Sequence, residues 1–209
     1  MFRRVVAILS ALFLASAILF ISVLRAASVN YAFSLPSEKT LGQSDTKEIN
    51  INYTLPYPGR ILPDHPLWPL KALRDKLWLL VTVNPSRKAE LVLLFADKRL
   101  SSSKILFERG KPELAFSTLS KGEKYLEEAV SLEVKNRKKG FDTKEFLAKA
   151  ANAALKHREV IGEILKVAPE DARPNIIKVE NYARDVYKNS RDALNSLGLP
   201  VPENPFNGD

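Results

Sequence analysis

The chain has 209 residues, enough for one medium-sized domain. Its 32 Lys and Arg residues against 24 Asp and Glu residues give a net charge of +8, and it contains no cysteine. The lack of cysteine excludes a disulfide framework, thiolate-based catalysis and any cysteine-ligated zinc or iron–sulfur site. Because 45% of the residues are apolar and 27% are charged, the composition is that of a folded protein.

An uncharged run of twenty residues, Val5–Leu24, stands between arginines near the N-terminus. A helix of this length rises about 30 Å, which matches the hydrocarbon core of a bilayer. We therefore expect residues 1–28 to be an uncleaved signal anchor; a signal peptide cleaved after Ser28 and a buried core helix are the alternatives. The two arginines before the run favour a cytoplasmic N-terminus, so the rest of the chain should lie outside the cytoplasm, held by a single pass or secreted after cleavage.

The segment that follows is predicted to be mostly irregular. Residues 29–52 are polar and should form a tether. Residues 48–55 indicate an extended piece with one buried face that lies across a helical surface, because apolar and polar residues alternate there: Ile49, Ile51, Tyr53 and Leu55. Residues 55–71 contain five prolines and should be stiff and extended.

From Pro69 onward the apolar spacing is helical. Prolines open and glycines close most of the segments, and Asp142 with Glu145 is predicted to form a capping box. The predicted helices are residues 69–82, 85–109, 112–139, 142–168 and 170–197, followed by a proline-rich tail, 199–209. Because short connections join long helices, the expected fold class is all-α, an elongated up-and-down bundle of about five helices over residues 53–198, preceded by the transmembrane helix and the extended proline-rich segment.

The sequence offers no group suited to catalysis or metal binding. Its two histidines are His65 and His157, and neither lies in a metal-binding motif. We expect His65 to take a turn or capping role, and His157, between Lys156 and Arg158, to be a solvated helix residue. No phosphate-binding glycine loop and no Gly-x-Ser-x-Gly motif is present. We therefore predict no enzyme activity, no catalytic residue, no metal and no cofactor.

The positive charge is unevenly distributed. Three arginines flank the apolar run, so +5 of the net charge of +8 falls on residues 29–209, mainly on residues 85–109 and 111–139. Two explanations are open: a solvated face with surplus lysine, or a patch for an anionic envelope polymer or lipid headgroups. Nucleic acid is not an expected partner, because few aromatic residues alternate with the basic ones.

A proline-rich entry followed by two helical motifs resembles a known pattern. The entry "LPDHPLWPLK" occupies residues 62–71, "KAEL" 88–91 and "ADKRL" 96–100, with Gly110 and Ala115 in the turn that follows. Together they resemble an uncharacterised family of helical domains in exported or membrane-anchored bacterial proteins, which carries Tyr where Trp68 stands here. The resemblance covers residues 53–130. It implies location and a helical fold but no catalytic residues, because the family has no established activity.

Five residues of this pattern form a candidate interaction surface: Trp68, Lys71, Asp97, Lys98 and Arg99. In the functional explanation, the proline-rich segment and the surface around Asp97 and Arg99 dock a partner. In the structural explanation, the start of the first helix plugs the end of the bundle with Leu67, Trp68 and Leu70, and Lys71 pairs with Asp75 four residues on.

The function expected from the sequence is therefore general. We expect a membrane-anchored extracytoplasmic helical module with a structural or interaction role toward a protein or an anionic envelope polymer. The alternative is a secreted module that binds an anionic polymer or a small ligand after signal cleavage. No sequence feature predicts the oligomeric state.

Overall fold

The computed structural model describes residues 49–206. Chain contacts divide the molecule into two units, Met1–Ala32 and Phe33–Asp209, and every described residue belongs to the second unit. The described part contains five α-helices and no strand, which confirms the all-α prediction. The helices are α2 (Trp68–Val81), α3 (Pro85–Glu108), α4 (Pro112–Lys138), α5 (Lys144–Val167) and α6 (Arg173–Ser196).

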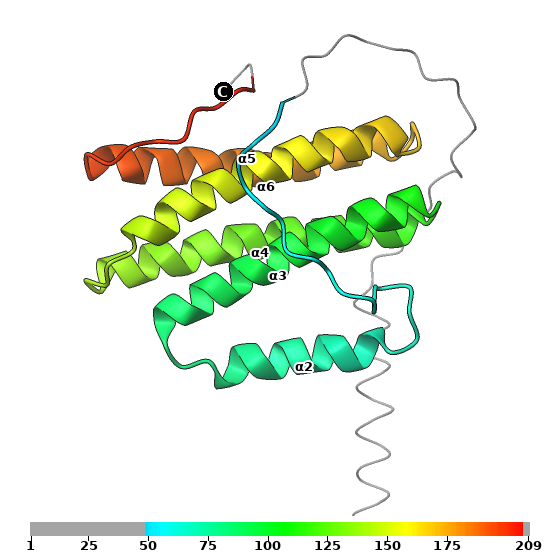
Figure 1. The fold of residues 1–209 in the computed structure, drawn as a ribbon, viewed down its shortest axis with the longest axis horizontal. Helices are drawn as coiled ribbons and strands as arrows, with labels where there is room; N and C mark the ends of the chain where they lie inside the picture. The colour runs from blue at the N-terminus through cyan, green and yellow to red at the C-terminus, as the bar shows by residue number, and fades with distance from the viewer. Residues whose placement is uncertain (1–48, 207–209) are drawn as a thin grey trace, which may run out of the picture. The chain divides into compact units, whose positions relative to one another are not determined.

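The four longer helices form two antiparallel hairpins, α3 with α4 and α5 with α6 (Figure 1). Contacts of α4 with α6 and of α3 with α5 join the two hairpins into one bundle. Among the helices, α2 packs against α3 alone. The predicted helical bundle is thus present, with α2 as a peripheral helix on one side of it.

Local signals fix most helix boundaries. At the start of α3, Asn84 Oδ1 accepts a hydrogen bond from the Arg87 amide at 3.0 Å, and a proline follows the cap. Gly110 ends the α3 turn with a φ of 67°, a left-handed conformation that favours glycine. The predicted capping box of Asp142 and Glu145 is wrong. Thr143 is the N-cap of α5, and its hydroxyl donates instead to the buried Glu133 at 2.7 Å.

The core lies between the two hairpins and is built from apolar side chains at helical spacing. In α5, small side chains allow close helix approach, and Ala150, Ala151, Ala153 and Ala154 are all fully buried. In α6 the buried apolar side chains include Ile176, Val179, Ala183, Val186 and Leu194. Leucines from the other helices, including Leu93 and Leu126, complete the same cluster.

Two non-helical segments lie on the bundle. The segment that begins at residue 49 crosses α3 and α5 without joining a sheet, as the alternation predicted (Figure 1). The Ile51 amide donates to Glu159 Oε2 of α5 at 2.7 Å, and Ile51 itself is buried. The C-terminal segment is held where Tyr187 Oη donates to the carbonyl of Pro202 at 2.8 Å.

The predicted membrane segment, residues 5–24, and most of the predicted tether lie outside the described residues. Between residues 49 and 206, no helix combines the length and apolarity that a transmembrane span requires.

Candidate functional site

The outward face of α2 is an exposed apolar stripe. None of the residues of α2 is buried. Five apolar side chains at helical spacing point away from the bundle: Leu70 (66% exposed), Leu73 (40%), Leu77 (52%), Leu80 (75%) and Val81 (69%). We call these five residues the α2 stripe. A contiguous exposed apolar face of this kind marks an interaction site more often than a scattered surface leucine does.

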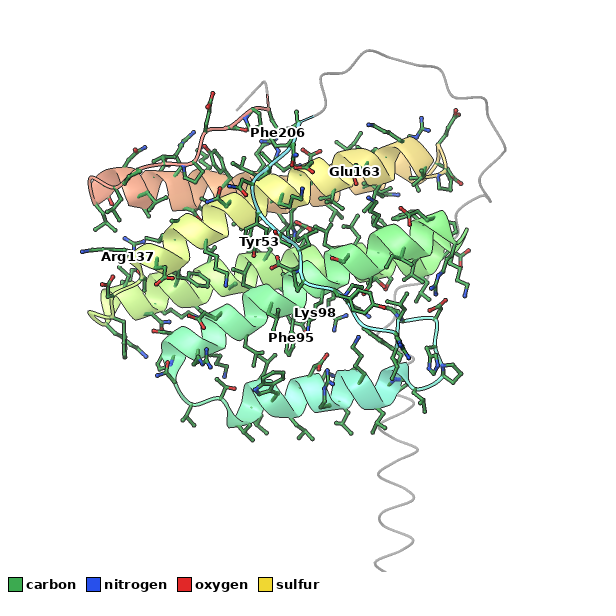
Figure 2. The ribbon with its side chains drawn as sticks, viewed as in Figure 1. Tyr53, Phe95, Lys98, Arg137, Glu163 and Phe206 are labelled. Atoms are coloured by element: carbon green, nitrogen blue, oxygen red, sulfur yellow. The ribbon has the colours of Figure 1, made fainter. Side chains whose placement is uncertain are left out.

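The opposite face of α2 is fixed to the bundle. Trp78 meets Phe95 of α3 edge to face, with ring centroids 6.2 Å apart, and Figure 2 shows Phe95 projecting from α3 on the side of α2. The ammonium of Lys71 donates to the carbonyls of Pro58 and Ile61 at 2.7 and 2.9 Å, which ties the proline-rich segment to α2. These contacts orient α2 so that its stripe faces outward.

The predicted plug at the end of the bundle is therefore wrong. Leu67 and Leu70 are 53% and 66% exposed, and Trp68 is half-buried. The predicted pair of Lys71 and Asp75 is not formed. The Lys71 ammonium instead binds the two backbone carbonyls, and Arg74 binds Asp75 at 2.6 Å. The physical reason is that α2 packs along the side of α3 instead of capping the bundle.

Cations border the α2 stripe. Arg74 and Lys76 are exposed beside it, whereas Asp75 lies on the inner face. Burial, and then the charges of Arg99 and Lys76, hold the pKa of the Lys121 ammonium below its usual range. Positive side chains from α2, α3 and α4 are therefore close enough to repel one another on this side of the bundle.

Four of the five residues predicted as an interaction surface come together here. The Arg99 guanidinium lies 5.7 Å from the ring centroid of Trp68 and 4.9 Å from that of Tyr125, while Lys71 lies 5.0 Å from the Trp68 ring. Lys98 borders a small surface depression together with Trp68, Lys71 and Arg99. The volume of this depression is only about 10 Å³, which leaves room for one water at most. The cluster is thus a packed cationic surface and not a ligand cleft.

The fifth predicted residue, Asp97, lies elsewhere. It is buried, and its Oδ2 accepts a hydrogen bond from Tyr53 Oη at 2.7 Å while its Oδ1 lies 3.0 Å from His157 Nε2. The other ring nitrogen of His157, Nδ1, lies 2.7 Å from Glu123 Oε1. Tyr53, Asp97, Glu123 and His157 form what we call the buried network, which joins α3, α4, α5 and the extended segment.

The expectation that His157 is a solvated helix residue is wrong, since its side chain is fully buried. Burial alone lowers the pKa of the imidazole, but the carboxylates of Glu123 and Asp97 outweigh it and raise the pKa to about 10. His157 is therefore an imidazolium at neutral pH and donates from both nitrogens. The cationic neighbours Lys156 and Arg158 suggested solvent, but the helical position of His157 places it on the core face.

The buried network is suited to a structural role. His157 and Glu123 are fully buried and Asp97 is nearly so, and the half-buried Tyr53 of the extended segment donates to Asp97. A substrate cannot reach these groups without opening the bundle. No group of three or more His, Cys, Asp or Glu side chains between residues 49 and 206 is arranged to hold a metal ion. His65 has the expected turn role, because its Nδ1 accepts from the Leu67 amide at 3.1 Å.

Comparison with known proteins gives one match. The model of a family described as "Domain of unknown function (DUF5667)" matches residues 60–171, more than half of the chain. This stretch runs from the proline-rich segment to the end of α5 and includes α2 and three of the four residues of the buried network. No curated protein and no solved structure matches the chain.

Proposed function

Because the chain belongs to the DUF5667 family of domains of unknown function, its family description supplies no activity, and we propose a role from the geometry of α2. In this proposal the chain is a non-catalytic interaction module. Residues 5–24 anchor it in a membrane, the helical bundle lies outside the cytoplasm, and the α2 stripe rests on the surface of the same bilayer. The exposed stripe with its flanking cations is the observation that carries the proposal.

The α2 stripe has the properties of an interfacial helix. Such helices bury an apolar face in the headgroup region and keep cations at its edges, where the side chains reach the lipid phosphates. Full burial of one leucine side chain contributes about 1.5–3 kcal/mol, and each cation near an anionic surface about 1 kcal/mol. Arg74 and Lys76 are placed to make the second contribution while the leucines make the first.

Charge favours a bilayer over a second copy of the chain. Two α2 stripes that met face to face would bring Arg74 and Lys76 of both copies together. Asp75 binds Arg74 of its own chain and offsets part of its charge, so the repulsion between two copies would come mainly from Lys76. An anionic lipid surface satisfies the apolar and the cationic features at once.

The sequence between the apolar run and the bundle permits α2 to reach the bilayer but does not require it. The uncharged run Val5–Leu24 is followed by 24 residues before Ile49. At about 3.3–3.6 Å per extended residue, a connection of this length can reach up to about 80 Å. Anchoring alone therefore does not force α2 onto the bilayer, so the anchor and the docking of α2 can be tested separately.

The test places a fluorescent probe on α2 in the full-length protein. The chain has no cysteine, so Leu77→Cys can be labelled with an environment-sensitive fluorophore after reconstitution into vesicles of phosphatidylcholine with phosphatidylglycerol. Ile177→Cys on α6 is the matched control, since the two side chains are 52% and 51% exposed. We expect a blue shift and quenching by lipid-borne quenchers at position 77 but not at position 177. Equal exposure of both probes to water would contradict the docking of α2.

Variants without the flanking cations test the contribution of charge to the docking of α2. Arg74→Gln with Lys76→Gln should weaken the blue shift at position 77 in phosphatidylglycerol vesicles, and the exposed α6 pair Lys178→Gln with Lys188→Gln should not.

Protease added outside cells tests the anchor and its orientation. Complete protection of the bundle from this protease in spheroplasts would contradict the extracytoplasmic location, whatever the result for α2.

A second candidate function follows from the cations of α3 and α4. Lys98, Arg99 and Lys121 lie on one side of the bundle, which favours a secreted module that binds an anionic polymer after cleavage behind Ser28. The intact mass of the mature protein separates the two candidates. A mature chain that begins at Val29, together with salt-sensitive binding to a phosphate polymer, would favour the secreted module.

A further inference from the structure

A separate cleft lies at the end of the bundle where α4 turns into α5. It has a volume of about 140 Å³ and is bordered by the start of α3, the end of α4, the turn and the start of α5. Arg137, labelled in Figure 2, marks this end of the bundle. An apolar cavity of about this size holds a molecule of six heavy atoms such as benzene. The cleft is therefore large enough for a small ligand, unlike the depression beside Trp68.

The cleft is acidic although the chain is basic. Four carboxylates border it, from Glu90, Glu133, Asp142 and Glu145, against one ammonium from Lys149. Two of these carboxylates also have cationic neighbours, since Glu90 lies 3.4 Å from Arg87 and Glu133 lies 2.9 Å from Arg137. The surplus of negative charge favours a cation over an anion or a neutral molecule.

Two buried polar side chains on α4 point to the chemistry of that cation. Glu133 is 1% exposed; its Oε1 accepts from Arg137 and from Thr143, whereas its Oε2 has no partner among the described residues. Asn136 is 4% exposed, and its Nδ2 has no acceptor there. Both residues border the cleft and stand three positions apart, on one face of α4. A buried acceptor and a buried donor without partners thus border the same cleft.

Leaving a buried polar group without a partner is costly, and more so for a charged group. One ligand can satisfy both if an ammonium donates to Glu133 Oε2 and a neighbouring oxygen accepts from Asn136 Nδ2. We propose that this cleft binds a small organic cation of that kind: a primary ammonium whose carbonyl or hydroxyl oxygen lies two bonds from the carbon that carries the ammonium group. A metal ion fits less well, because no three acidic or histidine side chains in residues 49–206 are arranged to coordinate one.

The test compares three small probes on the full-length protein in detergent. Glycinamide carries both groups, propionamide has the same shape without the charge, and propylammonium has the charge without the oxygen. The readout is the side-chain amide resonance of Asn136, assigned by its loss in Asn136→Ala. We expect a saturable shift with glycinamide and about tenfold weaker binding of the other two, because each lacks one hydrogen bond to the site.

Matched variants connect the binding to the carboxylates. Glu133→Gln removes the charge and keeps an oxygen for Thr143, so glycinamide should bind about tenfold more weakly. Glu145→Gln changes an exposed residue at the rim, and we expect about two- to fivefold weaker binding. Glu113→Gln, exposed in the first turn of the same helix α4, is the control and should bind glycinamide like the unmodified chain.

The outcomes are distinct. Circular dichroism reports whether Glu133→Gln stays folded; if it does not, the exposed Glu145→Gln still carries the comparison with Glu113→Gln. No saturable shift with glycinamide, equal shifts with all three probes, or equal binding by the Glu145→Gln and Glu113→Gln variants would each overturn the proposal. Membrane docking of α2 is read at position 77, so its result is independent of this one.

Discussion

His157 Nδ1 on α5 lies 2.7 Å from Glu123 Oε1 on α4, and neither side chain is exposed. With Asp97 on the other side of the ring, the imidazolium links three helices through charge-assisted hydrogen bonds. Burying these charges is costly, but removing one partner costs about 3–5 kcal/mol because the others stay buried without compensation. The buried network therefore fixes the register of α3, α4 and α5 and makes stability depend on one proton.

The first prediction concerns pH. The pKa of His157 is raised from 6.5 to about 10 on folding, so the folded state holds a proton that the unfolded state loses above pH 6.5. The stabilisation is complete below pH 6.5 and disappears as pH rises toward 10. Between pH 7 and 9 the free energy of unfolding should fall by up to about 1.4 kcal/mol per pH unit, measured by urea denaturation.

A control variant isolates the contribution of His157. His157→Gln has no titrating ring, so its lower free energy of unfolding should be nearly flat over the same pH range. Lys188→Gln, on the exposed side of α6, should keep the slope of the unmodified chain. A slope that survives in His157→Gln would show that other groups carry the pH dependence.

The second prediction concerns Tyr53. Burial, and then the neighbouring Asp97, raises the pKa of the Tyr53 phenol, so the hydroxyl stays protonated and keeps donating in alkaline solution. Tyr53→Phe removes this donor from the buried Asp97 and should lower the free energy of unfolding by about 1–3 kcal/mol. Tyr57→Phe is the matched control, because Tyr57 is 72% exposed. Equal thermal midpoints for the two variants would contradict a stabilising hydrogen bond.

The buried network could have been located in part from the sequence. Each of the three helical members occupies a core position of its own helix, three or four residues from buried apolar neighbours: Leu93, Asp97 and Leu100; Leu119, Glu123 and Leu126; Ala154, His157 and Ile161. A lone charge at such a position would be strongly destabilising. Three of them together imply that the charges meet, but which pairs form depends on how the helices rotate about their axes, and helical spacing carries no such information.

The orientation of α2 could not be predicted from the sequence, although its ends could. Proline, asparagine and glycine signals placed the helix ends within about three residues because caps are local. The leucines of α2 show the same spacing whether they face the core or solvent. Their outward direction results from contacts across the chain, where Lys71 binds the carbonyls of Pro58 and Ile61 and Trp78 meets Phe95. Local patterns cannot predict such contacts.

The third prediction separates the α2 stripe from the core. Leu77→Ala on the stripe should change the free energy of unfolding by less than about 0.5 kcal/mol, because the side chain is 52% exposed and no residue of α2 is buried. Leu93→Ala, fully buried in α3, should lower it by about 2–5 kcal/mol. Both values come from urea denaturation in detergent without vesicles. A large loss for Leu77→Ala would assign the stripe to folding and not to docking.

The fourth prediction concerns a close approach of α3 and α4, at Gly122. A Cβ atom at this position would lie 3.2 Å from Arg99 Cβ and 3.4 Å from the Ala96 carbonyl, backbone that cannot move freely. Gly122→Ala should therefore separate the helices beside the buried Glu123 and lower the free energy of unfolding by about 1–3 kcal/mol. Gly162→Ala is the matched control, because a Cβ there meets nothing within 4 Å. In α5 that change should raise stability by about 0.5–1 kcal/mol, since alanine favours helix. If the two alanine variants shifted the urea midpoint in the same direction, helix propensity and not close packing would govern position 122.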